Sequence, residues 1–228
     1  MSVVLQAERR LAGGYRESVA RNLLDRALAA AGLIATAPIG LLAAAAIVID
    51  DPGPVFFRQK RVGRDGQPFE LWKFRSMRRN NGGAQITAAS DSRITRVGRL
   101  LRKFKLDELP QLWNVVRGDM SLIGPRPEVP RYVDERDPVW TRVLSVRPGI
   151  TDLATLVFRN EEEILAKAED PERLYRERVL PDKLALNLEY IGKRNLFVDC
   201  KLLWWTVRYS FAPGGFESSK IRDKVLAG

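Results

Sequence analysis

The uncharged run at residues 27–49 constrains the fold of this chain more than any other feature. As a straight helix it would reach roughly 34 Å, enough to cross a hydrocarbon core of about 30 Å. It is followed by Asp50 and Asp51 rather than by a small-residue cleavage site, so it does not resemble a cleaved signal peptide. The run therefore predicts a segment that lies in lipid.

Pro38 lies at the centre of this run, with 11 uncharged residues on either side. Because proline removes a backbone donor and clashes with the preceding turn, we expect a bend there, and each half would reach only about 16 Å. Arginines stand on both sides of the run, so the positive-inside rule assigns no outer end. These features favour a re-entrant helix–break–helix over residues 16–50. A simple span and a buried core helix are the alternatives.

The composition limits the 228-residue chain to a few classes. Residues 51–228 make one ordinary domain, so we expect residues 1–228 to form a single membrane-associated catalytic domain with its larger part in the cytosol. A net charge of +10 favours anionic partners: phospholipid, nucleic acid or phosphorylated small molecules. Histidine is absent, so catalysis would depend on carboxylates, Lys, Tyr, Ser or a hard cation. Cys200 is the single cysteine, which excludes an internal disulfide.

The expected fold class is α/β and helix-dominated, with a small β-hairpin or sheet. Strands are expected at 55–59 and 68–77, because Asp65-Gly66 between them is typical of a tight hairpin turn. A polar loop is expected to about residue 92. Helical segments are expected near 94–104, 107–117, 129–136, 138–145, 161–168, 172–178, 184–191 and 198–211. Neighbouring tryptophans in the last of these suit an amphipathic helix at a lipid interface, one of several such helices, although they suit a core helix nearly as well.

Two adjacent carboxylates, Asp107 and Glu108, stand at the predicted start of the 107–117 helix. Asp107 could be an ordinary N-cap and Glu108 an ordinary first-turn acid. Both could also hold Mg²⁺, and a carboxylate is a competent nucleophile towards phosphorus, which makes an acyl-phosphate. The helix dipole would then keep Asp107 ionised. Asp119 could support the metal or merely cap a turn.

Basic residues near this pair are candidates for phosphate binding. Arg126 lies on a proline-braced loop and can bind phosphate with two parallel hydrogen bonds. Lys73 and Arg75 are two apart on a predicted strand, hence on one face, where they contact either phosphate or solvent.

Four long motifs give the chain a specific resemblance. They are residues 51–63 (DPGPVFFRQKRVG), 69–77 (FELWKFRSM), 106–114 (LDELPQLWN) and 118–127 (GDMSLIGPRP). In this order they resemble the bacterial sugar transferase family, the monotopic polyprenyl-phosphate phosphoglycosyl transferases. The resemblance covers the chain from about Arg21 to Thr151 and is closest to the short, catalytic-core type.

This resemblance implies a reaction. A UDP-sugar gives its sugar-1-phosphate to undecaprenyl phosphate, with Mg²⁺ and release of UMP, as the first membrane step of glycoconjugate or exopolysaccharide synthesis. Asp107 matches the family's nucleophile, and Glu108 matches the neighbour that helps to hold the metal. The family's membrane helix breaks at Ser-Pro; here the pair is Ala37-Pro38, with Thr36 as a substitute hydroxyl. The implied location is the inner (cytoplasmic) membrane facing the cytoplasm, and a homodimer is a candidate assembly.

The last third of the chain departs from the family pattern. The family often continues Pro-Gly-Ile-Thr-Gly-Trp, whereas this chain has Asp152 and Leu153 after Thr151. We expect this region to shape the sugar pocket. Two other functions remain as alternatives: an inert membrane scaffold of polysaccharide assembly, and a basic nucleic-acid-binding module. The apolar run and the lack of a base-stacking or major-groove motif argue against nucleic acid as a partner.

Overall fold

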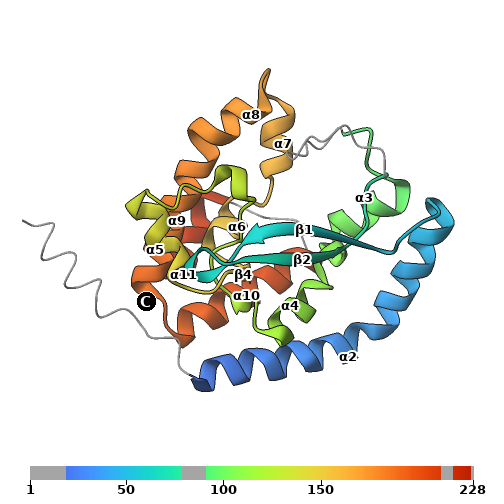
Figure 1. Cartoon of the computed structure of the whole chain (residues 1–228), viewed down its shortest axis with the longest axis horizontal. Coiled ribbons are helices and arrows are strands. Elements are labelled where there is room, and N and C mark those ends of the chain that lie inside the picture. The colour runs from blue at the N-terminus through green and yellow to red at the C-terminus, as the bar shows by residue number, and fades with distance from the viewer. Residues whose placement is uncertain (1–18, 79–90, 212–217, 227–228) are drawn as a thin grey trace, which may run out of the picture.

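The computed structural model describes residues 19–78, 91–211 and 218–226, and helices predominate in it (Figure 1). The helices are α2 (Val19–Asp50), α3 (Arg96–Lys103), α4 (Gln111–Arg117), α5 (Pro138–Leu144), α6 (Leu153–Val157), α7 (Glu161–Ala166), α8 (Pro171–Leu174), α9 (Leu180–Lys193), α10 (Leu196–Phe211) and α11 (Ser218–Leu226). The strands are β1 (Phe56–Val62), β2 (Pro68–Phe74), β3 (Ser121–Ile123) and β4 (Gly149–Thr151). Short 3₁₀ turns are η1 (Arg64–Gly66), η2 (Leu106–Glu108) and η3 (Pro130–Tyr132), and η4 (Tyr175–Val179) is π-helical.

Helix α2 contains the whole uncharged run and continues through Pro38. Figure 1 shows α2 following the lower edge of the molecule and then turning upward towards β1. The predicted break is therefore a bend within one continuous helix. Two residues before the proline, the Thr36 hydroxyl donates a hydrogen bond to the Gly32 carbonyl at 2.7 Å. The carbonyl that Pro38 leaves without its helical donor is that of Ile34, four residues earlier, so the Thr36 bond to Gly32 does not replace the bond that the proline removes.

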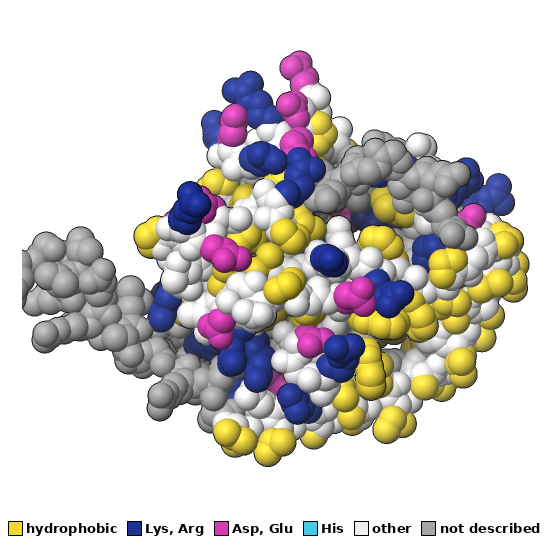
Figure 2. All heavy atoms as spheres, viewed as in Figure 1, with side chains coloured by type: hydrophobic (Ala, Val, Ile, Leu, Met, Phe, Trp, Pro, Cys, Tyr) yellow, Lys and Arg dark blue, Asp and Glu magenta, His cyan; other side chains and the backbone are white. Residues whose placement is uncertain are grey.

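Most of α2 is exposed although it is apolar. Its buried residues are Asp25, Ala29, Ala43 and Ile47. Ile34, Leu41 and Leu42 are 72–77% exposed, and Figure 2 shows hydrophobic side chains gathered along the lower and right-hand margin over α2. Exposing so much apolar surface to water is unfavourable, by about 25 cal/mol for each Å². The helix is also long and apolar enough to cross a membrane, which agrees with membrane association and not with a buried core helix.

Both ends of α2 are bound to the same folded body. Near the first end, Arg21 forms an ion pair with Asp199 of α10 at 2.7 Å. At the other end, the Asp50 carboxylate accepts a hydrogen bond from the Val97 backbone of α3 at 2.9 Å. Between them, Ala29 is fully buried against α4 and β2. The apolar helix is therefore fastened along one side.

Strands β1 and β2 form the predicted hairpin, paired antiparallel from Phe56–Phe74 to Val62–Pro68. Its turn requires left-handed backbone at two positions, and Asp65 (φ 55°) and Gly66 (φ 75°) are residue types that tolerate it. The strand boundaries differ from expectation: β1 runs to Val62, and β2 ends at Phe74 rather than at residue 77. Past that point the Ser76 carbonyl accepts a hydrogen bond from Thr95 beside α3.

A second sheet, not predicted from the sequence, joins β3 to β4 in parallel, with Ser121 opposite Gly149 and Ile123 opposite Thr151. Two glycines allow the approach, because a Cβ on Gly149 would lie 2.1 Å from the Gly124 backbone nitrogen. This pairing fixes the loop that follows β3 beside β4.

The other helix predictions had mixed outcomes. Those for α5 and α10 are confirmed within one or two residues. The helix predicted at 129–136 is wrong, since only the single turn η3 forms there. The segments predicted separately at 172–178 and 184–191 are continuous through α8, η4 and α9. The polar loop predicted to residue 92 lies mostly outside the described residues.

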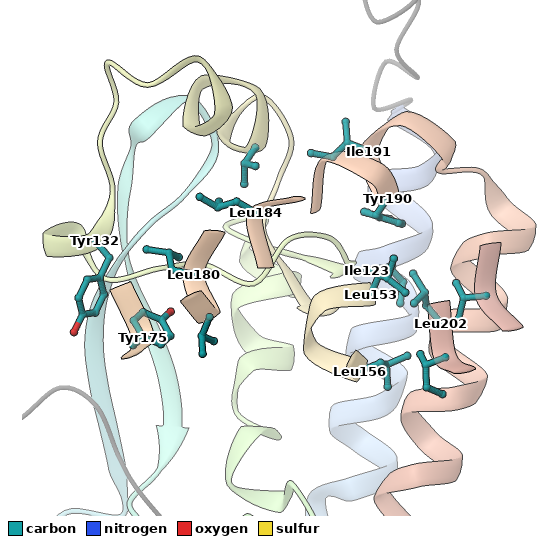
Figure 3. Close-up of a cluster of buried hydrophobic side chains, with 14 of the residues drawn as sticks. Ile123, Tyr132, Leu153, Leu156, Tyr175, Leu180, Leu184, Tyr190, Ile191 and Leu202 are labelled. Atoms are coloured by element: carbon teal, nitrogen blue, oxygen red, sulfur yellow. The ribbon is translucent and has the colours of Figure 1, made fainter. Parts of the chain in front are cut away.

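The largest hydrophobic core lies in the C-terminal half of the chain (Figure 3). It joins Ile123 of β3 to Leu153 and Leu156 of α6, and to the buried faces of α9 and α10. Tyr132 and Tyr175 lie at the opposite end of this cluster, with ring centroids 5.1 Å apart. The region that departs from the family pattern therefore forms the main core and one wall of the site described next.

Candidate active site

A cavity of about 840 Å³ lies between the β1–β2 hairpin, η2, the loop after β3 and the C-terminal helices. Asp107, Glu108, Lys73, Arg75 and Arg126 all line it. These five residues are the ones proposed from the sequence as catalytic, metal-binding or substrate-binding. The fold therefore brings them to one cavity, although their contacts differ.

Glu108 is held by two cations. Arg126 donates two hydrogen bonds to its carboxylate, at 3.0 Å from Nη1 to Oε2 and at 2.5 Å from Nη2 to Oε1. Lys73 Nζ lies 3.3 Å from the same Oε1. Burial alone would raise the pKa of Glu108, but the charges of Arg126 and Lys73 outweigh it and hold that pKa well below its usual range. Glu108 is therefore an anion with both oxygens engaged.

Asp107 has a different environment although it is the adjacent residue. It is 5% exposed, and its buried Oδ1 has no hydrogen-bond partner among the described residues. Burial raises the pKa of Asp107, with the charge of Lys73 opposing the shift. Asp107 is therefore a desolvated carboxyl at a cavity wall.

The local structure around Asp107 corrects the prediction made from the sequence. Helix α4 begins at Gln111, and Pro110 is its N-cap. Asp107 instead lies in the 3₁₀ turn η2, entered through Lys105 with a left-handed φ of 58°. Asp107 is thus not the cap of a 107–117 helix, and its pKa is raised by burial rather than held low as expected from a helix dipole.

Arg75 and Asp119 bind partners away from Glu108. Arg75 follows the end of β2, donates a hydrogen bond to the Asp51 carbonyl, and lies 3.4 Å from the Asp51 carboxylate. The Arg75 backbone N–H also donates to the Val55 carbonyl at 2.8 Å, which continues the β1–β2 pairing past Phe74, and Arg75 lines the same cavity as Lys73. Asp119 accepts a hydrogen bond from Asn114 at 3.2 Å and pairs with Arg117 at 3.4 Å, so it fastens the turn after α4.

Arg126 is positioned by a residue that the sequence did not single out. The Asp152 carboxylate is fully buried and accepts a hydrogen bond from the Arg126 backbone N–H at 3.1 Å. Its other oxygen accepts from the Thr155 N–H at 2.6 Å, as the N-cap of α6. The Arg126 side chain also donates to the Ile150 carbonyl at 3.2 Å. The departure from the family pattern at Asp152 was the one signal that could have identified this role.

The acidic residues at the cavity offer few ligands to a metal. Within the described part of the chain, no group of three or more His, Cys, Asp or Glu is placed to hold an ion. Asp107 and Glu108 supply two carboxylates, and Glu108 is already engaged by Arg126 and Lys73. Mg²⁺ commonly binds to one or two carboxylates together with substrate phosphates and waters. Asp107 and Glu108 are the carboxylates that could hold such an ion, together with the phosphates of a substrate.

Three curated proteins are among the relatives of this chain. A glucose-1-phosphate transferase acting on UDP-glucose and undecaprenyl phosphate, from Caulobacter vibrioides, is 41% identical over 86% of this chain and 72% of its own length. An N-acetylgalactosaminephosphotransferase acting on UDP-N-acetylgalactosamine and undecaprenyl phosphate, from Aeromonas hydrophila, is 40% identical over 75% of this chain and 38% of its own. A second glucose-1-phosphate transferase acting on UDP-glucose and undecaprenyl phosphate, from Escherichia coli (strain K12), is 37% identical over 82% of this chain and 39% of its own length.

These relatives are transferases, and two of them are much longer than this chain, which spans less than two fifths of each. Two donors, UDP-glucose and UDP-N-acetylgalactosamine, occur at nearly equal identity, so similarity alone does not select the sugar. The family model described as bacterial sugar transferase matches residues 16–213. This chain therefore belongs to the bacterial sugar transferase family.

Proposed function

We propose that this protein transfers a sugar-1-phosphate from a UDP-sugar to undecaprenyl phosphate and releases UMP. The observation that carries this proposal is the buried Asp107 oxygen, which has no hydrogen-bond partner among the described residues, at a cavity that also presents Arg126 and Lys73. Two cations beside a desolvated carboxylate suit an attack on a phosphorus atom whose oxygens are negatively charged. Membership of the family supports the choice of substrates.

The proposed reaction has two displacements. In the first, an Asp107 oxygen forms a bond to the phosphorus that bears the sugar, and the bond from that phosphorus to the bridging oxygen breaks. UMP leaves with the bridging oxygen, and the sugar phosphate stays on Asp107 as an acyl-phosphate. In the second, a phosphate oxygen of undecaprenyl phosphate attacks the same phosphorus. The acyl-phosphate bond breaks, Asp107 returns to a carboxylate, and a diphosphate-linked sugar forms.

The residues around Asp107 have separate roles in this proposal. Glu108 holds Arg126 and Lys73 in place, and both cations face the phosphate groups from the cavity wall. A Mg²⁺ ion bound with the diphosphate, through Asp107 and Glu108, would neutralise charge on the leaving UMP. Arg126 remains charged in this environment, since Glu108 raises its pKa against the effect of burial.

The arrangement of α2 supports a re-entrant membrane segment. Arg21 and Asp50, near its two ends, both bind the same folded body, and the helix between them, which contains Pro38, turns along its course (Figure 1). A straight span would place the two ends on opposite sides of the bilayer, away from a common partner. We therefore propose that both ends lie on the cytoplasmic side of the inner membrane, so that the cavity lies close to the headgroups of the acceptor lipid.

The test is to measure UMP release by the protein in lipid nanodiscs with undecaprenyl phosphate, Mg²⁺ and either UDP-glucose or UDP-N-acetylgalactosamine. We expect release with at least one donor, and an added sugar phosphate in the intact mass when the acceptor is omitted. Asp107→Asn should lose both signals, whereas Asp119→Asn, a matched change outside the cavity, should keep them. Undiminished turnover by Asp107→Asn would contradict the covalent mechanism.

A further inference from the structure

A second cluster of polar side chains lines the same cavity, beyond Arg126. We name it the Glu128 cluster, and its members are Arg61, Glu128, Glu161, Tyr175 and Lys183. The Tyr175 hydroxyl donates a hydrogen bond to Glu128. Lys183 Nζ lies 3.0 Å from Glu161 and 3.7 Å from Glu128, and Arg61 lies 3.7 Å from Glu128. The cluster is therefore one connected network.

The network is assembled from distant parts of the chain. Glu128 lies two residues after Arg126 on the same loop, and Arg61 donates to the intervening Pro127 carbonyl at 2.9 Å. Tyr175 opens the π-helical segment η4, and Lys183 lies on α9. Short π-helical segments occur often at functional sites, because the extra residue in the turn redirects a side chain. The Glu128 and Lys183 side chains are only 10% and 9% exposed.

The charges of the cluster determine what kind of group it can bind. Arg61 and Lys183 are balanced by Glu128 and Glu161, so the cluster as a whole offers no excess positive charge to a phosphate. Burial and the neighbouring Glu128 raise the pKa of Tyr175, which keeps its phenol protonated. The Tyr175 O–H is already donated to Glu128, so the cavity wall here presents carboxylate and phenol oxygens as acceptors and the Lys183 ammonium as a donor. This combination suits a neutral group that carries several hydroxyls.

We infer that the Glu128 cluster binds the sugar of the donor and that Tyr175, Glu128 and Lys183 determine which sugar is accepted. This inference rests on the proposed function. With the diphosphate between Arg126 and Lys73, the sugar is joined to the phosphorus next to Asp107, and the Glu128 cluster continues the same wall. The nucleoside, at the other end of the diphosphate, extends away from it.

The test compares Tyr175→Phe with the unmodified protein in nanodiscs, using UDP-glucose, UDP-N-acetylgalactosamine and deoxy analogues of the better donor. Removing the hydroxyl takes a donor from a charged, buried partner, so kcat/KM for the better donor should fall about 10- to 100-fold. In the unmodified protein, kcat/KM should be lower for the deoxy analogue that lacks the hydroxyl contacting the cluster. In Tyr175→Phe, this difference in kcat/KM between the donor and that analogue should be smaller. The inhibition constant of UMP should stay within about twofold, because UMP lacks the sugar.

Tyr190→Phe is the matched control. Its buried hydroxyl also bonds to a carboxylate, Asp199, at 2.7 Å, but it does not line the cavity. This control should lose stability yet keep the ratio of kcat/KM between the two donors. Should Tyr175→Phe also keep that ratio while the unmodified protein is active, the inference is wrong and the proposed function stands. If Tyr175→Phe weakened UMP binding as much as it lowered kcat/KM for the donor, the nucleoside would lie at the cluster and the inference would be refuted. No transfer by the unmodified protein from any donor would refute the proposed function itself.

Discussion

Replacing Asp152 by Asn should destabilise the protein and impair donor binding, although the two side chains have nearly the same shape. The Asp152 carboxylate accepts from the Thr155 N–H at 2.6 Å and from the Arg126 N–H at 3.1 Å, with no exposed surface. Asparagine offers one acceptor oxygen and one NH₂ group. In either orientation its NH₂ faces a backbone N–H, so one buried donor loses its partner.

The magnitude follows from two opposing effects. A buried donor left without a partner costs about 1–3 kcal/mol. Burial also raises the pKa of the Asp152 carboxyl, so removing its charge recovers part of that loss. We expect a net loss of about 1–2 kcal/mol, which lowers Tm by roughly 2–8 °C for a domain of this size. Because the lost partner includes the Arg126 backbone, the KM for the UDP-sugar should also rise.

The assay is thermal unfolding together with UMP-release kinetics, both in nanodiscs, with Asp137→Asn as the control. Asp137 is also a helix N-cap, of α5, and accepts from the Val139 N–H at 2.8 Å. Asparagine is an equally good cap there, so its effect should stay within about 0.5 kcal/mol. If Asp152→Asn matches Asp137→Asn in both Tm and KM, Asp152 does not position Arg126.

Two further changes test burial and packing. Because burial raises the folded-state pKa of Asp107, its ionisation weakens the fold at neutral pH, and Asp107→Asn should gain on the order of 1 kcal/mol in thermal unfolding at pH 7. That gain in stability should vanish as the pH falls through the raised pKa of Asp107 to below about 3.9. A gain that stays constant with pH would contradict a raised pKa for Asp107. Gly98→Ala should lower the free energy of unfolding by more than about 1 kcal/mol, since the added Cβ would lie 2.0 Å from the Ser76 carbonyl oxygen. Gly192→Ala, on α9 with open space around it, should raise the free energy of unfolding by about 0.5–1 kcal/mol. Equal Tm values for the two alanine variants would refute the predicted clash.

Features set by neighbouring residues were predictable from the sequence. Asp65-Gly66 indicated the hairpin because both residues tolerate the left-handed backbone that its turn needs. The start of α4 was not predictable in the same way. Pro110 suits the first turn of a helix beginning at Asp107 as well as it suits the N-cap of one beginning at Gln111. What separates the two is the left-handed Lys105, a residue type that gives no signal for that conformation.

Features set by contacts between distant segments were out of reach. The β3–β4 pair has three residues in each strand, too few to show an alternation of buried and exposed positions. That pairing places the Arg126 loop beside Asp152, and the packing of α9 then brings Lys183 to Glu128. Lys183 and Tyr175 fit an ordinary polar helix equally well in the sequence. Their place at the cavity depends on the turn of η4, which no local pattern marks.

The environments of Asp107 and Glu108 distinguish two acids that the sequence presents as equivalent neighbours. Asp107 is buried and the Glu108 side chain is 12% exposed, but Glu108 has two cations within hydrogen-bond distance, whereas Asp107 has a buried oxygen with no partner among the described residues. The pKa of Glu108 is accordingly lowered and that of Asp107 raised. A carboxylate that accepts three hydrogen bonds from Arg126 and Lys73 is a weak base, so an attack by Glu108 would first have to break those bonds. Asp107, when ionised, is the more basic and less solvated of the two, which favours it as the nucleophile. Breaking the Glu108 pairs should therefore weaken phosphate binding, whereas only the loss of Asp107 should remove the covalent intermediate.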